Sequence, residues 1–182
     1  LEMVEAPVTG GVPGAVAGTL TMIVGGPAAA FEKAKPYLEI VGGKVVHCGE
    51  AGAGQAVKIC NNMMLAINMI GVAEGMSLIR GLGIDPSVLA EVSTAGSGNS
   101  WALTNYNPEP GLTEGAPANN GYKPGFAGAM MAKDLGLAVG AGVETGVPLA
   151  LGSAAAQMFQ LYCAGGMAGD DMSGIIRMLK SK

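Results

Sequence analysis

The chain has 182 residues, of which 10 are Lys or Arg and 14 are Asp or Glu, so its formal net charge is −4. This length fits one domain, or one domain and a fragment, since a domain averages roughly 150 residues. The acidic balance argues against a nucleic-acid partner, whose phosphates need clustered Lys and Arg. Hydrophobic residues make up 49% and charged residues 13%, which argues against disorder.

The composition also predicts how the core is built. Aromatic residues make up only 4% of the chain, while 31 residues are Gly and 12 are Met. We therefore expect a core of Ala, Val, Ile, Leu and Met, in which Gly and Ala let helices approach closely. The longest uncharged stretch on a likely core helix, Ile59 to Ala73, is shorter than the ~20 apolar residues of a membrane span. We expect no membrane partner.

The cysteine and histidine content predicts neither a disulfide framework nor a metal site. Three cysteines, Cys48, Cys60 and Cys163, are widely spaced and form no C-x-x-C motif. An odd number of scattered cysteines is typical of reduced thiols in a cytosol-like compartment. The one histidine, His47, lies near the end of a predicted strand, and we expect it to cap the strand end rather than to catalyse.

Residues 1–48 have the pattern of the last part of an α/β sheet. Strands are predicted at Met3–Val8, Leu20–Val24 and Lys44–Cys48, and a helix from Pro27 to about Ile40. Residues 9–11 end the first strand. The chain starts with Leu rather than Met and shows no secretory signal, so it is expected to be part of a longer protein.

Residues 49–182 have a helical pattern. The segment from Gln55 to about Leu82 is apolar almost all round, which predicts a helix buried on every face in a bundle. A Pro- and Gly-rich segment, 105–125, predicts a long ordered loop. Further helices are predicted at 86–94, 126–144 and 147–163, and a final amphipathic helix begins at Asp170 and includes Ile175, Ile176, Met178 and Leu179.

The glycine run at 49–54 leads into the long helix but matches no standard nucleotide motif. Its order is G-x-x-G-x-G rather than the dinucleotide fingerprint G-x-G-x-x-G. It is no P-loop either, because Lys58 stands four residues beyond the last glycine and no Ser or Thr follows it.

Lys58 and Asn62 form the candidate catalytic pair. Burial of an ammonium on an apolar helix is costly and lowers the lysine pKa toward values useful for proton transfer. Asn62 lies four residues later, on the same helix face, and can hold an oxygen ligand beside the amine. The alternative is a lysine near a helix start whose amine reaches solvent.

Two other clusters could hold ligands. Thr9, Gly10 and Gly11 follow a strand and could form a nest of backbone N–H groups for a carboxylate or phosphate, or else an ordinary glycine turn. Lys133 and Asp134 could be a site lysine with a supporting carboxylate, or else a solvated ion pair.

Four stretches together resemble the 3-hydroxyisobutyrate dehydrogenases of the β-hydroxyacid dehydrogenase family, and the likeness runs through nearly all of the chain. Residues 5–11 with 18–21 resemble the family's substrate-binding segment, and residues 52–63 resemble its catalytic helix. Trp101 with 106–111 resembles a loop of the subfamily, and residues 131–138 resemble its cofactor-side lysine helix.

The resemblance implies a mostly α fold. Residues 1–48 would be a remnant of the Rossmann-type cofactor domain, most of which is absent. Residues 49–182 would be a 6-phosphogluconate-dehydrogenase-like helical domain for substrate binding and dimerisation. It also implies a homodimer or homotetramer, cytoplasmic in a bacterium and in the mitochondrial matrix in a eukaryote.

The resemblance implies the roles of single residues as well. Lys58 corresponds to the catalytic lysine, and Asn62 to an asparagine that helps bind substrate. Thr9, Gly10 and Gly11 correspond to the segment that holds the substrate carboxylate. Lys133, with Asp134 beside it, corresponds to a lysine near the nicotinamide. The family usually has Asp and Ser where this chain has Glu5 and Thr9.

The implied activity is NAD-dependent oxidation of 3-hydroxyisobutyrate to methylmalonate semialdehyde in valine breakdown, with NADP as a possible cofactor and Lys58 as general acid and base. One alternative is a related short hydroxyacid dehydrogenase, such as a tartronate semialdehyde reductase. Another is an inactive fragment that serves only as a helical dimerisation module. The chain by itself is expected to be inactive, because most of the cofactor site is missing.

Overall fold

The computed structural model describes residues 2–179. The chain divides into two compact units, residues 1–61 and residues 62–182, which are described separately.

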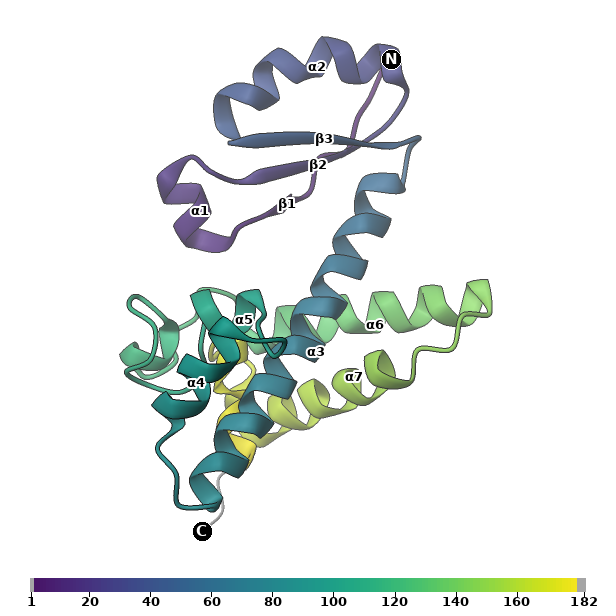
Figure 1. Cartoon of the computed structure of the whole chain (residues 1–182). Coiled ribbons are helices and arrows are strands. Elements are labelled where there is room, and N and C mark those ends of the chain that lie inside the picture. Colours follow the sequence, from purple (N-terminus) through teal and green to yellow (C-terminus); the bar gives the residue numbers. More distant parts are fainter. Residues whose placement is uncertain (1, 180–182) are drawn as a thin grey trace. The chain divides into compact units, whose positions relative to one another are not determined.

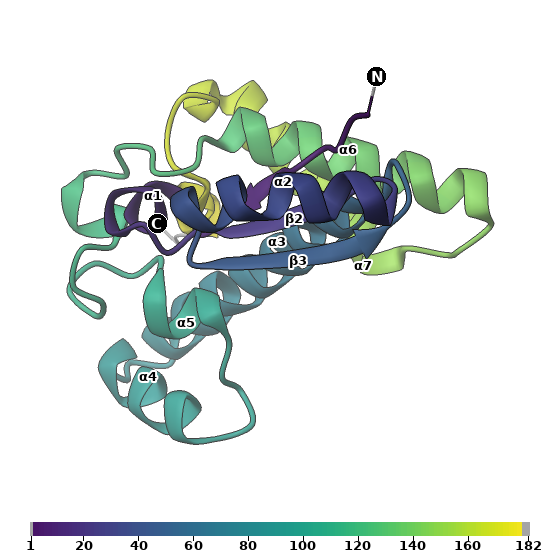
Figure 2. The same cartoon turned by 90° about the horizontal axis from the view of Figure 1, so that it is seen from above.

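The first unit contains a three-stranded sheet. Its strands are β1 (Val8–Thr9), β2 (Thr21–Gly25) and β3 (Lys44–Gly49), in the order β1-β2-β3. β1 runs antiparallel to β2, and β2 runs parallel to β3. The crossover between the two parallel strands is α2 (Ala28–Val41), which lies along β2 and β3 (Figures 1 and 2). These elements confirm the predicted strand–strand–helix–strand order.

The first strand is shorter than predicted because a proline interrupts its hydrogen bonding. Glu5 still bridges Gly25 in the register of β1 and β2. Between these pairs, Ile23 donates its N–H to the carbonyl of Pro7 over 2.8 Å. Pro7 has no N–H to return, so the ladder is incomplete there. The predicted Met3–Val8 strand is therefore recognisable as extended backbone, but only its end forms a regular strand.

A short helix, α1 (Gly11–Ala17), was not predicted. Gly10 (φ 128°) and Gly11 (φ 63°) begin it in the left-handed region that favours glycine. Pro13 lies in its first turn, where a proline is tolerated. A helix this short has too few apolar positions to show a 3.6-residue period, which is why the sequence pattern did not reveal it.

The long helix α3 (Ala53–Gly81) begins in the first unit and continues into the second. One face carries Ala66, Met69, Ala73 and Met76, all fully buried. The prediction of burial on every face is wrong for this chain, because large apolar side chains on the opposite face are exposed: Val57 by 45%, Met64 by 61% and Leu78 by 66%.

By length and composition alone, α3 is the one helix of residues 2–179 that could cross a membrane. Core helices of soluble proteins meet the same two conditions, and α3 packs as a core helix in the second unit, where its buried face joins the main apolar cluster.

The rest of the second unit is helical. The regular helices are α4 (Pro86–Ala95), α5 (Trp101–Asn105), α6 (Gly128–Thr145) and α7 (Ala150–Tyr162). Shorter turns are η1 (Pro117–Asn120), η2 (Cys163–Met167) and η3 (Met172–Leu179). The predicted final helix is present but is a 3₁₀ helix, and α5 was not predicted. Asp85 caps α4 as expected, accepting the Ser87 N–H over 2.8 Å.

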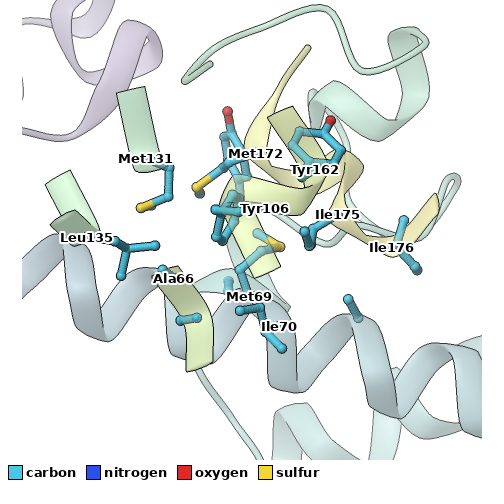
Figure 3. Packing of buried hydrophobic residues seen from close by; sticks show 14 of the residues in the cluster. Ala66, Met69, Ile70, Tyr106, Met131, Leu135, Tyr162, Met172, Ile175 and Ile176 are labelled. Atoms are coloured by element: carbon cyan, nitrogen blue, oxygen red, sulfur yellow. The ribbon is translucent and has the colours of Figure 1, made fainter. Parts of the chain in front are cut away.

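The core of the second unit gathers around α3 (Figure 3). Aliphatic and Met side chains supply most of it, as the composition predicted. The largest fully buried side chains are nevertheless aromatic, Tyr162 and Phe159 of α7. Close helix approach depends on glycine: a Cβ at Gly128 of α6 would lie 2.6 Å from the Tyr162 ring, and one at Gly152 of α7 would lie 2.7 Å from the sulfur of Met63.

The Pro- and Gly-rich segment is ordered, as predicted, and a buried carboxylate organises it. Asp171 is fully buried and accepts the Tyr106 hydroxyl over 2.8 Å. Its carboxylate also accepts backbone N–H groups of Gly125, Phe126 and Ser173, each over 2.9 Å. One side chain therefore joins the end of α5, the loop residues just before α6 and the start of η3.

Candidate functional site

The Thr9–Gly11 turn lies where β1 ends and α1 begins. The positive φ angles of Gly10 and Gly11 curl the backbone in the manner of an anion-binding nest. Thr9 is half-buried, and its Oγ1 accepts a hydrogen bond from Nδ2 of Asn61 over 3.4 Å. Within the first unit, the Thr9–Gly11 turn is therefore connected to the third turn of α3.

Lys58 lies in the first turns of α3 and is half-buried. Gly54, Lys58 and Asn61 share one face of the helix, because they are spaced by four and three residues. Residues on this face contact the strand segment 5–9: the Gly54 N–H donates to Oε1 of Glu5 over 3.1 Å, and Asn61 binds Thr9. Lys58 lies between these two contact points on the helix.

Asn62 is 2% exposed and is held by a carboxylate of α6. Its Nδ2 donates to Oδ2 of Asp134 over 2.6 Å, and Asp134 itself is 7% exposed. Lys133 forms an ion pair with Oδ1 of the same carboxylate over 2.9 Å, while its side chain is 61% exposed. Asp134 therefore contacts both other predicted site residues of the second unit.

The hydrogen bond to Asp134 sets how the Asn62 amide is turned. An amide has two donors on nitrogen and an acceptor oxygen. Because Nδ2 donates to Asp134, the nitrogen end of the amide is turned toward α6.

The last glycine of the run that leads into α3, Gly54, packs closely against the sheet. A Cβ at Gly54 would lie 2.6 Å from the carbonyl oxygen of Ile23 and 2.9 Å from the nitrogen of Gly25. The Gly54 N–H already binds Glu5. Gly54 therefore allows close packing of the helix on the strand.

Two site-related residues were missed from the sequence. Glu5 was noted only as a departure from the family pattern, yet it binds the start of α3 across 49 positions. Asp171 was not singled out, yet it organises the loop that carries Tyr106. Burial, followed by the charge of Asp171, raises the pKa of the Tyr106 phenol far above its ordinary value.

Two family models match the chain. The model described as NAD-binding of NADP-dependent 3-hydroxyisobutyrate dehydrogenase matches residues 52–179. The model described as NAD binding domain of 6-phosphogluconate dehydrogenase matches residues 1–49. The second match agrees with the sheet of the first unit, and the first with the helical unit.

Curated relatives carry the same family name. The chain is 46% identical over 181 residues to mitochondrial 3-hydroxyisobutyrate dehydrogenase of Drosophila melanogaster, a match that covers 100% of this chain and 56% of the relative. It is 46% identical over 178 residues to the human mitochondrial enzyme of that name, covering 98% of this chain and 53% of the relative. The chain thus spans about half the length of the curated relatives it matches.

Solved structures agree with these matches. A Mycobacterium tuberculosis 3-hydroxyisobutyrate dehydrogenase, solved with L-serine, is 46% identical with a TM-score of 0.92 and covers 98% of this chain and 61% of its own. A 3-hydroxyisobutyrate dehydrogenase from Salmonella typhimurium is 32% identical with a TM-score of 0.82, covering 98% and 60%.

The fold is accordingly mostly α, a 6-phosphogluconate-dehydrogenase-like helical domain preceded by strands of an NAD-binding domain. The match over residues 52–179 shows that this chain belongs to the 3-hydroxyisobutyrate dehydrogenase family.

Proposed function

We propose that the complete enzyme containing this chain oxidises 3-hydroxyisobutyrate to methylmalonate semialdehyde with NAD, with Lys58 as general acid and base. One structural observation carries the proposal. Lys58 and Asn62 stand one turn apart on α3, and Asp134 holds the amide nitrogen of Asn62 in a buried hydrogen bond. An amine beside an oriented amide oxygen is suited to a substrate hydroxyl.

In the proposed mechanism the substrate carboxylate binds the backbone N–H groups of the Thr9–Gly11 turn. The amine of Lys58 must be neutral to act as a base. It accepts the hydroxyl proton while the hydride leaves the adjacent carbon, and the C–O bond becomes a carbonyl. In the reverse direction the ammonium of Lys58 returns this proton to the alkoxide oxygen. Positioned proton transfer of this kind contributes about 10²–10⁴-fold to the rate.

Asn62 and the residues of α6 support this step. Asn62 orients the reacting oxygen, and its own orientation is set by Asp134. Lys133 is exposed and points its charge toward the nicotinamide end of the cofactor in this proposal, with Asp134 beside it. Lys133 and Asp134 together place one positive and one negative charge next to Asn62.

The nicotinamide, when bound, supplies the hydride acceptor. The glycine run at 49–54 lacks the fingerprint G-x-G-x-x-G that would hold its pyrophosphate, and Glu5, Ile23 and Gly25 surround its last glycine, Gly54. We therefore propose that residues 1–48 act as a remnant of the cofactor domain and 49–182 as the substrate and dimerisation domain, and that these 182 residues alone do not turn over substrate. NADP is the alternative cofactor.

The related short hydroxyacids remain the second candidate substrates, with tartronate semialdehyde on the reducing side. The matched relatives include mitochondrial and bacterial proteins. We propose a cytoplasmic location in a bacterium and a mitochondrial matrix location in a eukaryote. Assembly through the helical domain into a dimer or tetramer completes the proposal.

A substrate panel tests the proposed activity. The complete enzyme is assayed with 3-hydroxyisobutyrate and with glycerate in the oxidising direction, and with tartronate semialdehyde in the reducing direction, each with NAD and NADP cofactors. We expect the highest kcat/KM for 3-hydroxyisobutyrate with NAD. A higher kcat/KM for glycerate or tartronate semialdehyde would assign the alternative activity, and no turnover with any of them would contradict the proposal.

A further inference from the structure

We infer that Glu5 is a positioning residue: its carboxylate binds the first turn of α3 and so sets the place of Lys58 along the substrate-binding strand. The inference rests on the proposed role of Lys58. Its structural part concerns only the first unit, in which Glu5, the sheet and the start of α3 all lie.

The first observation is the contact itself. Oε1 of Glu5 accepts the backbone N–H of Gly54 over 3.1 Å. Gly54 is the second residue of α3, and the first N–H groups of a helix have no partner inside the helix. α3 has no acidic residue in its own first turn. Glu5 thus supplies, from 49 positions upstream, the negative charge that the start of a helix favours.

The second observation is that the surrounding backbone makes room for this carboxylate. A Cβ at Gly25 would collide with Oε1 of Glu5 and lie 2.7 Å from the Gly54 nitrogen. A Cβ at Gly54 would lie 2.6 Å from the carbonyl oxygen of Ile23. Two residues without side chains therefore face each other across the contact, and the carboxylate occupies the space between them.

The third observation ties this contact to Lys58. Glu5 pairs with Gly25 through both backbone hydrogen bonds, 2.9 and 3.0 Å, so its backbone is fixed to the sheet. Four residues after Gly54 stands Lys58 on the same helix face, and three residues later Asn61 binds Thr9. The helix is therefore bound to strand segment 5–9 on both sides of Lys58. Glu5 makes the contact on the N-terminal side of Lys58, and Thr9 makes the contact on its C-terminal side.

The position of a catalytic group matters steeply, since a displacement of ~1 Å can cost about 10²-fold in rate. Loss of the Glu5 carboxylate would release the start of α3 while leaving the lysine itself intact. The expected defect is in kcat rather than in binding of the cofactor.

Hydrogen exchange in this chain and kinetics in the complete enzyme test the inference together. In Glu5→Ala, amides 54–58 should exchange about tenfold faster, the effect of one charge-assisted hydrogen bond, while β3 amides stay unchanged. kcat should fall about 10-fold or more, with KM for NAD unchanged. Glu5→Gln, which keeps an acceptor oxygen, should recover part of both losses. Glu39→Gln, an exposed change on α2, is the matched control.

Gly54→Ala provides a second route, because its Cβ pushes the helix from the strand while Glu5 remains. It should reproduce the kcat defect. Unchanged exchange at 54–58 in Glu5→Ala would overturn the inference, and so would normal kcat per folded molecule. Normal turnover in Lys58→Ala would instead contradict the proposed function. The hydrogen-exchange result would still show whether Glu5 holds the start of α3.

Discussion

Asn62 and Asp134 form a buried hydrogen bond of 2.6 Å that joins α3 to α6. The bond links two residues 72 positions apart and gives Asp134 a structural partner that its sequence neighbours do not reveal. It also turns the amide of Asn62, so that the group proposed to hold the reacting oxygen is fixed before substrate arrives.

Asp134→Ala is expected to lower both stability and turnover. It leaves the buried Nδ2 of Asn62 without this acceptor, a loss of about 1–3 kcal/mol in unfolding free energy. Urea unfolding of Asp134→Ala, Asn62→Ala and the double variant should give a coupling energy of ~1 kcal/mol. Glu144→Gln, at an exposed position of the same helix, is the control. If the losses in unfolding free energy of the two single variants simply added up in the double variant, the hydrogen bond would contribute nothing to stability.

The buried tyrosines predict lower stability in alkali. Burial is the main cause that raises the pKa of Tyr106, Tyr122 and Tyr162 above 10.0 in the folded protein. As pH rises past about 10, the unfolded chain therefore releases these protons first. The contribution of these tyrosines to the free energy of unfolding is full below about pH 10 and is lost progressively above that pH.

Urea midpoints between about pH 9 and about pH 11 should fall, and the fall should be smaller in Tyr106→Phe. This variant also loses the bond to Asp171, so its midpoint is lower throughout. Tyr37→Phe, at a 72% exposed site, is the control. A Tyr106→Phe variant whose midpoint falls as steeply as that of the parent would contradict the assignment.

The exposed side of α3 predicts assembly. Val57, Met64 and Leu78 recur at intervals of seven residues or multiples of seven, so they form one apolar stripe along the helix. We expect a homodimer or larger assembly. Sedimentation should show it at micromolar concentration, and Leu78→Lys should weaken it. Ile40→Lys, at an 81% exposed position of α2, should not. A well-folded monomer of the parent chain would count against the prediction.

The 182 residues alone are expected to fold but not to bind or use NAD. The helical unit has its own core, whereas the glycine run at 49–54 lacks the dinucleotide fingerprint G-x-G-x-x-G. Calorimetric titration with millimolar NAD should be flat, while circular dichroism shows helices. Saturable NAD binding, or NADH production with 3-hydroxyisobutyrate, would refute this expectation.

The strong periodic elements and the spacing of Lys58 and Asn62 could be predicted from the sequence. The strands β2 and β3 and the helices α2, α3, α4 and α6 were all found within a few residues, because each has a clear apolar period or a cap such as Asp85. Lys58 could also be identified as a candidate from the sequence, because it is a charged residue near the start of a long apolar helix.

The contacts that support the site could not be predicted, since they join distant positions. Nothing near Glu5 in the sequence indicates that it binds Gly54, and nothing near Asp134 indicates Asn62. The uniform apolarity of α3 was misleading for a related reason. Composition shows that Met64 and Leu78 are apolar, but only the arrangement of the other helices shows which face they leave exposed.

The role of Lys58 is tested most directly by single-turnover and steady-state kinetics of Lys58→Ala in the complete enzyme, with Lys44→Ala on β3 as the control. Proton transfer from the substrate hydroxyl is the step that only this amine is proposed to perform. We predict that turnover of 3-hydroxyisobutyrate falls about 10²–10⁴-fold in Lys58→Ala, while NAD affinity is unchanged. Near-normal turnover in Lys58→Ala, in a protein as folded as the parent, would contradict the account.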